Sequence, residues 1–84
     1  PYNLAGTTAY VRASDYATLR SSASTSAPAV TALDYNFSCD VIKKIGTSSN
    51  DRNNFYYVNS SGYYGYIRAD LLSPYPNPTP YYGN

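Results

Sequence analysis

The stretch NFYYVNSSGYYGYIRADLL, residues 54–72, decides the fold of this chain. Residues 55–58 and 63–67 are rich in Tyr, Phe, Val and Ile, which favour the pleated, half-buried surface of a β-strand. The polar residues 59–62 (NSSG) separate the two runs and predict a hairpin with a four-residue loop. Gly65 interrupts the second strand, where a missing side chain indicates a bulge or a close backbone approach.

The rest of the chain carries further short strands and shows no helical period. Strands are predicted at residues 9–13, 15–20, 30–33 and 37–45, with loops at 21–28 and 46–54 and a single helical turn at 69–71. In the longest of these strands, alternation is expected to place Cys39, Val41 and Lys43 on one face. Short strands at this spacing predict an all-β domain, a small barrel or a sandwich.

The composition argues against catalysis and metal binding. The 84 residues form one domain, and they include no His, Glu, Gln, Met or Trp. Without His and without a Cys-x-x-Cys pair, the usual zinc sites cannot form, and no metal or cofactor is expected. Cys39 lies in an apolar strand with no imidazole to activate it, so we interpret it as a structural thiol, with a reactive or intermolecular thiol as the alternative. We expect no enzymatic activity from this chain alone.

Charge and hydropathy exclude two further classes of partner. The net charge is +1 and the basic residues are scattered, so the chain lacks the basic stripe that nucleic-acid binding needs. No apolar run is long enough to span a membrane. Tyr makes up twelve of the 84 residues, among abundant Ser, Thr and Asn, and this composition favours an extracellular or cell-surface protein. Asn36 and Asn59 each begin a glycosylation sequon at a predicted turn, although a turn role alone explains Asn59.

The C-terminal residues 73–84 (SPYPNPTPYYGN) form a segment of different composition. Prolines at every second position from 74 to 80 remove backbone donors and favour an extended, polyproline-like chain. We predict that this tail lies against an aromatic surface, of its own barrel or of a neighbour, through Tyr75, Tyr81 and Tyr82. The alternative is a linker or spacer between modules.

Two parts of the sequence together resemble a known family. Residues 17–26 (ATLRSSASTS) resemble the Leu-Asn-Val-Arg-Ser-like opening and small-residue loop of bacterial-type SH3 domains (SH3b), with Leu19 in the core position and Arg20 matching directly. Ser22 and Ala23 depart from the Gly-Pro pair of that family. The hairpin residues 55–58 and 65–67 resemble its Gly-Trp-Tyr-x-Val and Gly-aromatic-Val steps.

The resemblance implies a fold and a general role. The fold would be a small SH3-like barrel of five to seven short strands over residues 8–72, preceded by a lead-in at 1–7 and followed by the Pro/Tyr-rich tail at 73–84. Members of the family are mostly non-catalytic modules of cell-wall hydrolases and other exported bacterial proteins. They bind peptidoglycan peptides or the partner catalytic domain.

The resemblance also implies a shallow binding groove between the loop after Arg20 and the aromatic hairpin. Aromatic faces would supply flat apolar area for a peptide backbone, and carboxylate and amide groups would form the rim. Phe55 and Tyr66 are the strongest candidates, whereas Arg20 and Arg68 are interpreted as solubilising residues at strand edges. The candidate ligand-binding residues are Tyr10, Asp15, Tyr16, Asn53, Asn54, Phe55, Tyr57 and Tyr66. The alternative for each aromatic residue is a place in the core or in a cross-strand pair.

Two functions are therefore predicted. The first is an extracellular, non-catalytic binding module that recognises a cell-wall peptide or a partner domain through an aromatic groove. The alternative is a structural subunit or stalk piece of an extracellular assembly, in which the chain associates with itself through tails that pack between subunits. An ordered tail must pack on some surface, which favours the second function. Size-exclusion chromatography with and without residues 73–84 separates the two functions.

Overall fold

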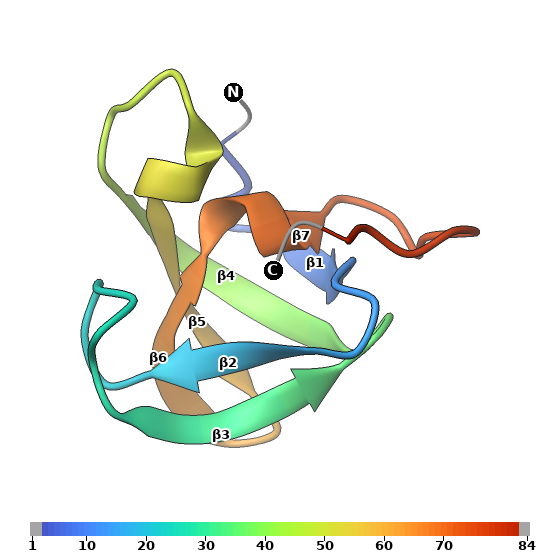
Figure 1. The fold of residues 1–84 in the computed structure, drawn as a ribbon, viewed down its shortest axis with the longest axis horizontal. Helices are drawn as coiled ribbons and strands as arrows, with labels where there is room; N and C mark the ends of the chain where they lie inside the picture. The colour runs from blue at the N-terminus through green and yellow to red at the C-terminus, as the bar shows by residue number, and fades with distance from the viewer. Residues whose placement is uncertain (1–2, 83–84) are drawn as a thin grey trace.

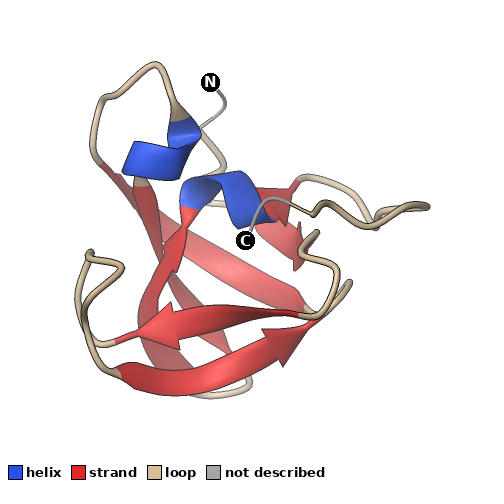
Figure 2. Ribbon diagram, in the orientation of Figure 1, coloured by secondary structure: helices blue, strands red, loops and turns tan. Residues whose placement is uncertain are grey.

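The computed structural model describes residues 3–82, within which seven antiparallel strands form one sheet that curls around a single core (Figures 1 and 2). The sheet order is β3-β2-β6-β5-β4-β1-β7. The strands are β1 (Thr8–Val11), β2 (Tyr16–Arg20), β3 (Ala29–Asp34), β4 (Ser38–Ile45), β5 (Phe55–Ser60), β6 (Tyr63–Arg68) and β7 (Leu72–Ser73). The predicted all-β barrel of five to seven strands is confirmed. Residues 1–2 and 83–84, at the outer ends of the predicted lead-in and tail, lie outside the described residues.

Two single 3-10 turns interrupt the strands. The turn η2 (Ala69–Leu71) follows β6 where a helical turn is predicted, and η1 (Asp51–Asn53) lies in the loop before β5, where none is predicted. In the part of the chain that the structure describes, no helix is long and apolar enough to cross a membrane. The two turns lie close together at one end of the barrel (Figure 2).

The aromatic hairpin forms with a tighter turn than predicted. β5 and β6 pair from Phe55–Arg68 to Ser60–Tyr63, which leaves a two-residue turn of Ser61 and Gly62. Both turn residues have positive φ, 52° and 87°, as the favoured two-residue hairpin turns with two left-handed residues require. Asn59 supports the turn, since its Oδ1 accepts a hydrogen bond from the Gly62 N–H at 3.1 Å. Two residues assigned to the predicted loop, Asn59 and Ser60, therefore belong to β5.

Gly65 marks a close backbone approach, one of the two predicted outcomes. A Cβ at this position would lie 2.6 Å from the Arg20 carbonyl oxygen and 2.9 Å from Cγ of Leu19. Only glycine lets β6 approach β2 this closely without a shift of the backbone. Just beside it, Arg20 and Tyr66 are the register pair that joins the two strands.

A register shift in β4 corrects the predicted face of Lys43. Cys39 and Val41 are buried as expected, but the pairing of β4 with β5 shifts between Val41 and Lys43, at Ile42. This extra residue reverses the alternation, so Lys43 is exposed and Lys44 turns inward. The Lys44 ammonium lies 5.5 Å from the ring centroid of Tyr56 and 3.0 Å from a carboxylate oxygen of Asp51.

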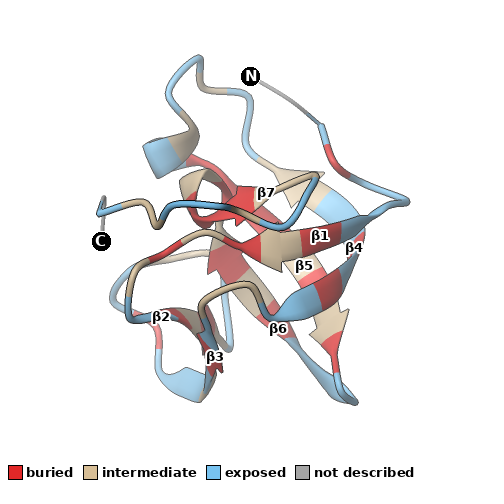
Figure 3. Cartoon of the chain, turned by 90° about the vertical axis from the view of Figure 1, so that its right-hand side faces the viewer, coloured by how far each residue is buried: buried red, intermediate tan, exposed pale blue. Residues whose placement is uncertain are grey.

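The core lies between the inner faces of the strands, where buried positions line β1, β5 and β6 (Figure 3). Its largest fully buried side chains include Tyr56, Leu19 and Ile67. Cys39 is part of this core, and burial, aided by the nearby Asp40 carboxylate, raises the pKa of its thiol to about 12. The thiolate is therefore suppressed at neutral pH, as expected of a structural cysteine.

Residues 3–7 of the predicted lead-in are part of the folded domain. Leu4 is buried in the core, and its N–H donates to the Tyr56 hydroxyl at 3.1 Å. Gly6 and Thr7 form backbone hydrogen bonds with Val41 on β4, at 2.8 and 2.9 Å. Gly6 and Thr7 thus continue the pairing of β1 with β4, and Leu4 adds to the core.

The tail also lies on its own barrel, but not on an aromatic surface. The Asn77 backbone N–H donates to Oδ1 of Asn36 at 2.7 Å, and the Asn77 carbonyl accepts from Asn36 Nδ2 at 3.0 Å and from the Tyr35 hydroxyl. Tyr81 packs against the core. Tyr75 and Tyr82 are 75% and 80% exposed, so the prediction that they pack is wrong for their own barrel. The prolines hold the chain extended, and it is attached by the polar groups of Asn77 and by the backbone, ring and hydroxyl of Tyr81.

Candidate functional site

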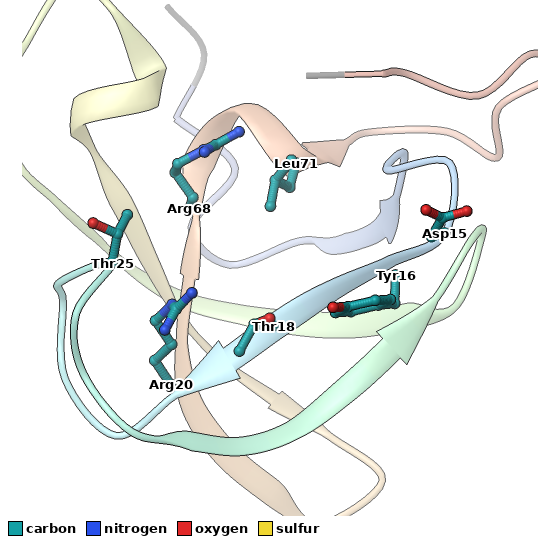
Figure 4. A pocket seen from close by; sticks show the side chains of 7 residues that line it. All are labelled: Asp15, Tyr16, Thr18, Arg20, Thr25, Arg68 and Leu71. Carbon is teal, nitrogen blue, oxygen red and sulfur yellow. The ribbon is translucent and has the colours of Figure 1, made fainter. Parts of the chain in front are cut away.

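A cleft of about 370 Å³ opens beside β2 (Figure 4). β2 pairs with β3 along its whole length, but on its other side its register with β6 is limited to Arg20 and Tyr66. The two strands diverge beyond this point, and the cleft lies between β2 and the segment formed by the end of β6 and η2. The residues that line it are Asp15, Tyr16, Thr18, Arg20, Thr25, Arg68 and Leu71.

The wall formed by β2 follows from strand alternation. Ala17 and Leu19 are buried, whereas the cleft residues Tyr16, Thr18 and Arg20 lie on the opposite face. Tyr16 is 50% exposed, so a large part of its ring can contact a ligand. The Arg20 guanidinium donates to the Ala27 carbonyl at 2.8 Å, which ties the strand to the loop 21–28. Since a guanidinium has five N–H donors, Arg20 can bind this loop and a ligand together.

The facing wall carries a second arginine held by a carboxylate. Arg68 forms a two-point ion pair with Asp70, through Nε to Oδ1 and through Nη2 to Oδ2 at 2.9 Å. Arg52 lies 3.8 Å from the same carboxylate. Because this pairing fixes the guanidinium, Arg68 presents a defined edge to the cleft. Figure 4 shows Arg68 and Leu71 across the cleft from Tyr16 and Thr18.

The cleft thus combines both signs of charge with flat apolar area. Arg20 and Arg68 can hold a carboxylate, and the exposed Asp15 can hold an amine. Tyr16 and Leu71 supply the apolar surface between them. A smaller cavity of about 130 Å³ lies between β3 and the β5–β6 turn, but Asp34 is the one charged residue among those that line it. The larger cleft is therefore the better candidate for a polar ligand.

The predicted site residues separate into four groups, of which the fourth, Tyr57 and Tyr66, is described below. Asp15 and Tyr16 line the cleft. Tyr10 in β1 and Asn53 in η1 do not line it, although Asn53 is exposed. Asn54 and Phe55 are 1% and 7% exposed and neither lines the cleft, so they are not the rim and groove residues that the sequence predicts.

Asn54 is buried because it organises the loop before β5. Its Nδ2 donates to the Ser48 carbonyl at 2.9 Å and to Asp51 at 2.8 Å, and its Oδ1 accepts from the Ser48 N–H at 3.0 Å. Although burial opposes the change, the hydrogen bonds from Asn54 and Lys44 lower the pKa of Asp51. The amide is thus fully occupied within the protein.

Tyr57 and Tyr66 lie outside the cleft, in a cross-strand cluster. Their ring centroids are 4.9 Å apart, and Tyr57 is 6.1 Å from Tyr64. All three are on the face of β5 and β6 opposite to the buried Val58 and Ile67. They pack as cross-strand pairs, which is the predicted alternative to ligand binding for these aromatic residues.

Sequence reasoning missed most of the cleft. The sequence favours a solubilising role at strand edges for Arg20 and Arg68, and it does not single out Thr18, Thr25 or Leu71 as ligand contacts. The alternation of β2 was a usable signal, because Tyr16, Thr18 and Arg20 must share a face once Leu19 is placed in the core. The facing wall had no comparable signal, since only the fold brings Arg68 and Leu71 opposite β2.

Comparison with known protein families identifies the family of this domain. The family model for the bacterial SH3 domain matches residues 15–73. This chain belongs to that family. All the residues that line the cleft of this bacterial SH3 domain fall inside the match. Bacterial SH3 domains are binding modules and are generally non-catalytic. No curated protein and no solved structure matches the chain.

Proposed function

We propose that this bacterial SH3 domain is a non-catalytic extracellular module that binds cell-wall peptides in the cleft beside β2. The observation that carries the proposal is the cleft itself, which presents Arg20 and Arg68 together with the exposed Asp15 and Tyr16. The alternative ligand for the same cleft is a peptide segment of a partner protein domain.

The chemistry of peptidoglycan stem peptides suits this set of side chains. Such peptides are short and extended, with carboxylate and amine groups close together. Guanidinium groups pair with carboxylates through charge-assisted hydrogen bonds, and Asp15 offers the opposite charge to an amine. Tyr16 and Leu71 would cover the apolar side chains, and Thr18 and Thr25 would bind the peptide backbone.

The extracellular location is supported by composition. The chain combines twelve Tyr with many Ser, Thr and Asn residues and a net charge of only +1. A binding function is also consistent with a sequence that has no His or Glu and one Cys. Binding needs groups that recognise a ligand, whereas catalysis needs a nucleophile or a general base.

Co-sedimentation with purified peptidoglycan tests the proposal. Tyr16→Ala and Arg20→Ala should each reduce the bound fraction, because each removes a cleft contact. Tyr75→Ala is the matched control, since Tyr75 is 75% exposed and does not line the cleft. Equal binding by all four proteins, or no binding by the wild type, would contradict a cell-wall ligand in this cleft.

The alternative, a structural subunit whose tails pack between subunits, has less support. The contacts of Asn77 and Tyr81 are with the same barrel that carries the tail. Size-exclusion chromatography with and without residues 73–84 separates the two functions. An oligomer that dissociates on removal of the tail would favour the assembly.

A further inference from the structure

Tyr81 lies beyond the family match, yet it contacts the chain segments next to both walls of the cleft. On one side it joins the connector between β1 and β2. Its N–H donates to the Arg12 carbonyl at 2.6 Å, and its carbonyl accepts from the Ser14 N–H at 3.0 Å. These two bonds make a parallel bridge with Ala13. The next residues along the connector are Asp15 and Tyr16, which line the cleft.

On the other side Tyr81 joins η2. Its hydroxyl donates to Oδ2 of Asp70 at 3.0 Å, the same oxygen that Arg68 Nη2 contacts at 2.9 Å. Asp70 thus connects the tail to an arginine of the cleft wall. The carboxylate is only 10% exposed, so its geometry depends on these protein partners more than on water.

The ring of Tyr81 is held independently of its hydroxyl. The Arg12 guanidinium lies 4.0 Å from the ring centroid, a cation–π distance, and the ring packs against the core. Upstream, Asn77 fixes the tail to Asn36 in the β3–β4 turn. The tail is therefore attached at two points, and at the second point Tyr81 bonds the segment just before Asp15 and the carboxylate of Asp70, which lies between Arg68 and Leu71 in the chain.

We propose that Tyr81 is a positioning residue for ligand binding: it joins the two walls of the cleft and, through Asp70, fixes Arg68 to receive a ligand carboxylate. This inference rests on the proposed function and assigns part of it to a segment outside the matched region. The functional module then extends to Tyr81 instead of ending at β7.

The physical reason is the cost of ordering an arginine. A guanidinium that moves among several side-chain conformations must lose that freedom when it binds a carboxylate. Asp70 restricts Arg68, and Tyr81 in turn restricts Asp70 by bonding the shared oxygen. Removing the hydroxyl leaves the fold, the ring contact and the backbone bonds in place, but it releases this restriction.

Tyr81→Phe tests the proposal, with Tyr82→Phe as the matched control because Tyr82 is 80% exposed. The probe is a soluble synthetic stem peptide with a free C-terminal carboxylate, compared with the same peptide as its C-terminal amide. NMR also follows the Arg68 Nε–H signal and its hydrogen exchange. We expect Tyr81→Phe to weaken binding of the carboxylate peptide about threefold to tenfold and to speed exchange at Arg68 Nε–H. Affinity for the amide peptide should change much less.

Three results would overturn the proposal. The first is an unchanged affinity for the carboxylate peptide in Tyr81→Phe, and the second is an equal loss for both peptides, which would indicate general damage. The third is an unchanged Arg68 Nε–H exchange rate. Failure of the proposed function is distinguishable, because a wild type that binds neither peptide still shows by Arg68 exchange whether Tyr81 restrains this side chain.

Discussion

The β5–β6 hairpin and the C-terminal tail are both rich in tyrosine, but they are held to the domain by different interactions. In the hairpin, strand alternation buries Tyr56 completely and leaves Tyr57 and Tyr66 to pack with each other on the outer face. In the tail, the amide of Asn77 and the backbone, ring and hydroxyl of Tyr81 carry the attachment, whereas Tyr75 is exposed. The same residue type is thus structural or incidental according to whether the sheet provides a place for it.

The strongest test of this contrast is Tyr56→Ala in the hairpin. Tyr56 is 1% exposed, and its hydroxyl accepts a hydrogen bond from the Leu4 N–H. Truncating a large buried aromatic costs about 3–5 kcal/mol, against a total of roughly 4–12 kcal/mol for a domain of this size. We expect the variant to be largely unfolded by circular dichroism at 25 °C. Tyr64→Ala, on the exposed face of β6, is the control and should stay folded.

Gly65→Ala tests the other contribution of the hairpin, its approach to β2. The new Cβ would lie 2.6 Å from the Arg20 carbonyl oxygen, so the backbone must shift. Such overpacking typically costs about 1–3 kcal/mol. Urea denaturation should report this loss. Because Arg20 lines the cleft, the shift should also weaken peptide binding. Full stability in this variant would show that β2 and β6 are not in tight contact.

Asn36→Gly tests the attachment of the tail. Asn36 has a φ of 62°, so glycine keeps its backbone conformation and removes the side chain that bonds Asn77. We expect a loss of about 1 kcal/mol and faster proteolysis within the tail, with the barrel intact. Ser61→Gly, at the other non-glycine residue with positive φ, is the matched control for the change to glycine. A tail equally protected in both variants would contradict anchoring by Asn36.

Tyr75→Ala should have the smallest effect. The side chain is 75% exposed, and exposed substitutions of this kind usually change stability by less than about 0.5 kcal/mol. The melting temperature and peptidoglycan co-sedimentation should both match the wild type. A clear loss of stability would mean that tyrosines in the tail stabilise the domain by burial, as those of the hairpin do.

Prediction from sequence succeeded where local chemistry determines structure. Alternating apolar residues located most strands, and Gly65 was expected at a close approach. The prediction failed at the bulge near Ile42, because one extra residue in β4 reverses the faces of Lys43 and Lys44 without any local signal. It also failed for Asn54, which was expected at a rim but is buried by its bonds to Ser48 and Asp51.

The sequence by itself determined the all-β class, the positions of the strands and the family resemblance, because these depend on residue type and spacing within short windows. Only the tertiary structure decided which side chains share a surface. Arg68 and Tyr16 are distant in sequence, and they line opposite walls of the cleft because β2 diverges from β6 beyond Arg20. Likewise, Tyr81 differs from Tyr82 because the Arg12–Ser14 connector and Asp70 receive its backbone and hydroxyl, and such long-range partners leave no local pattern.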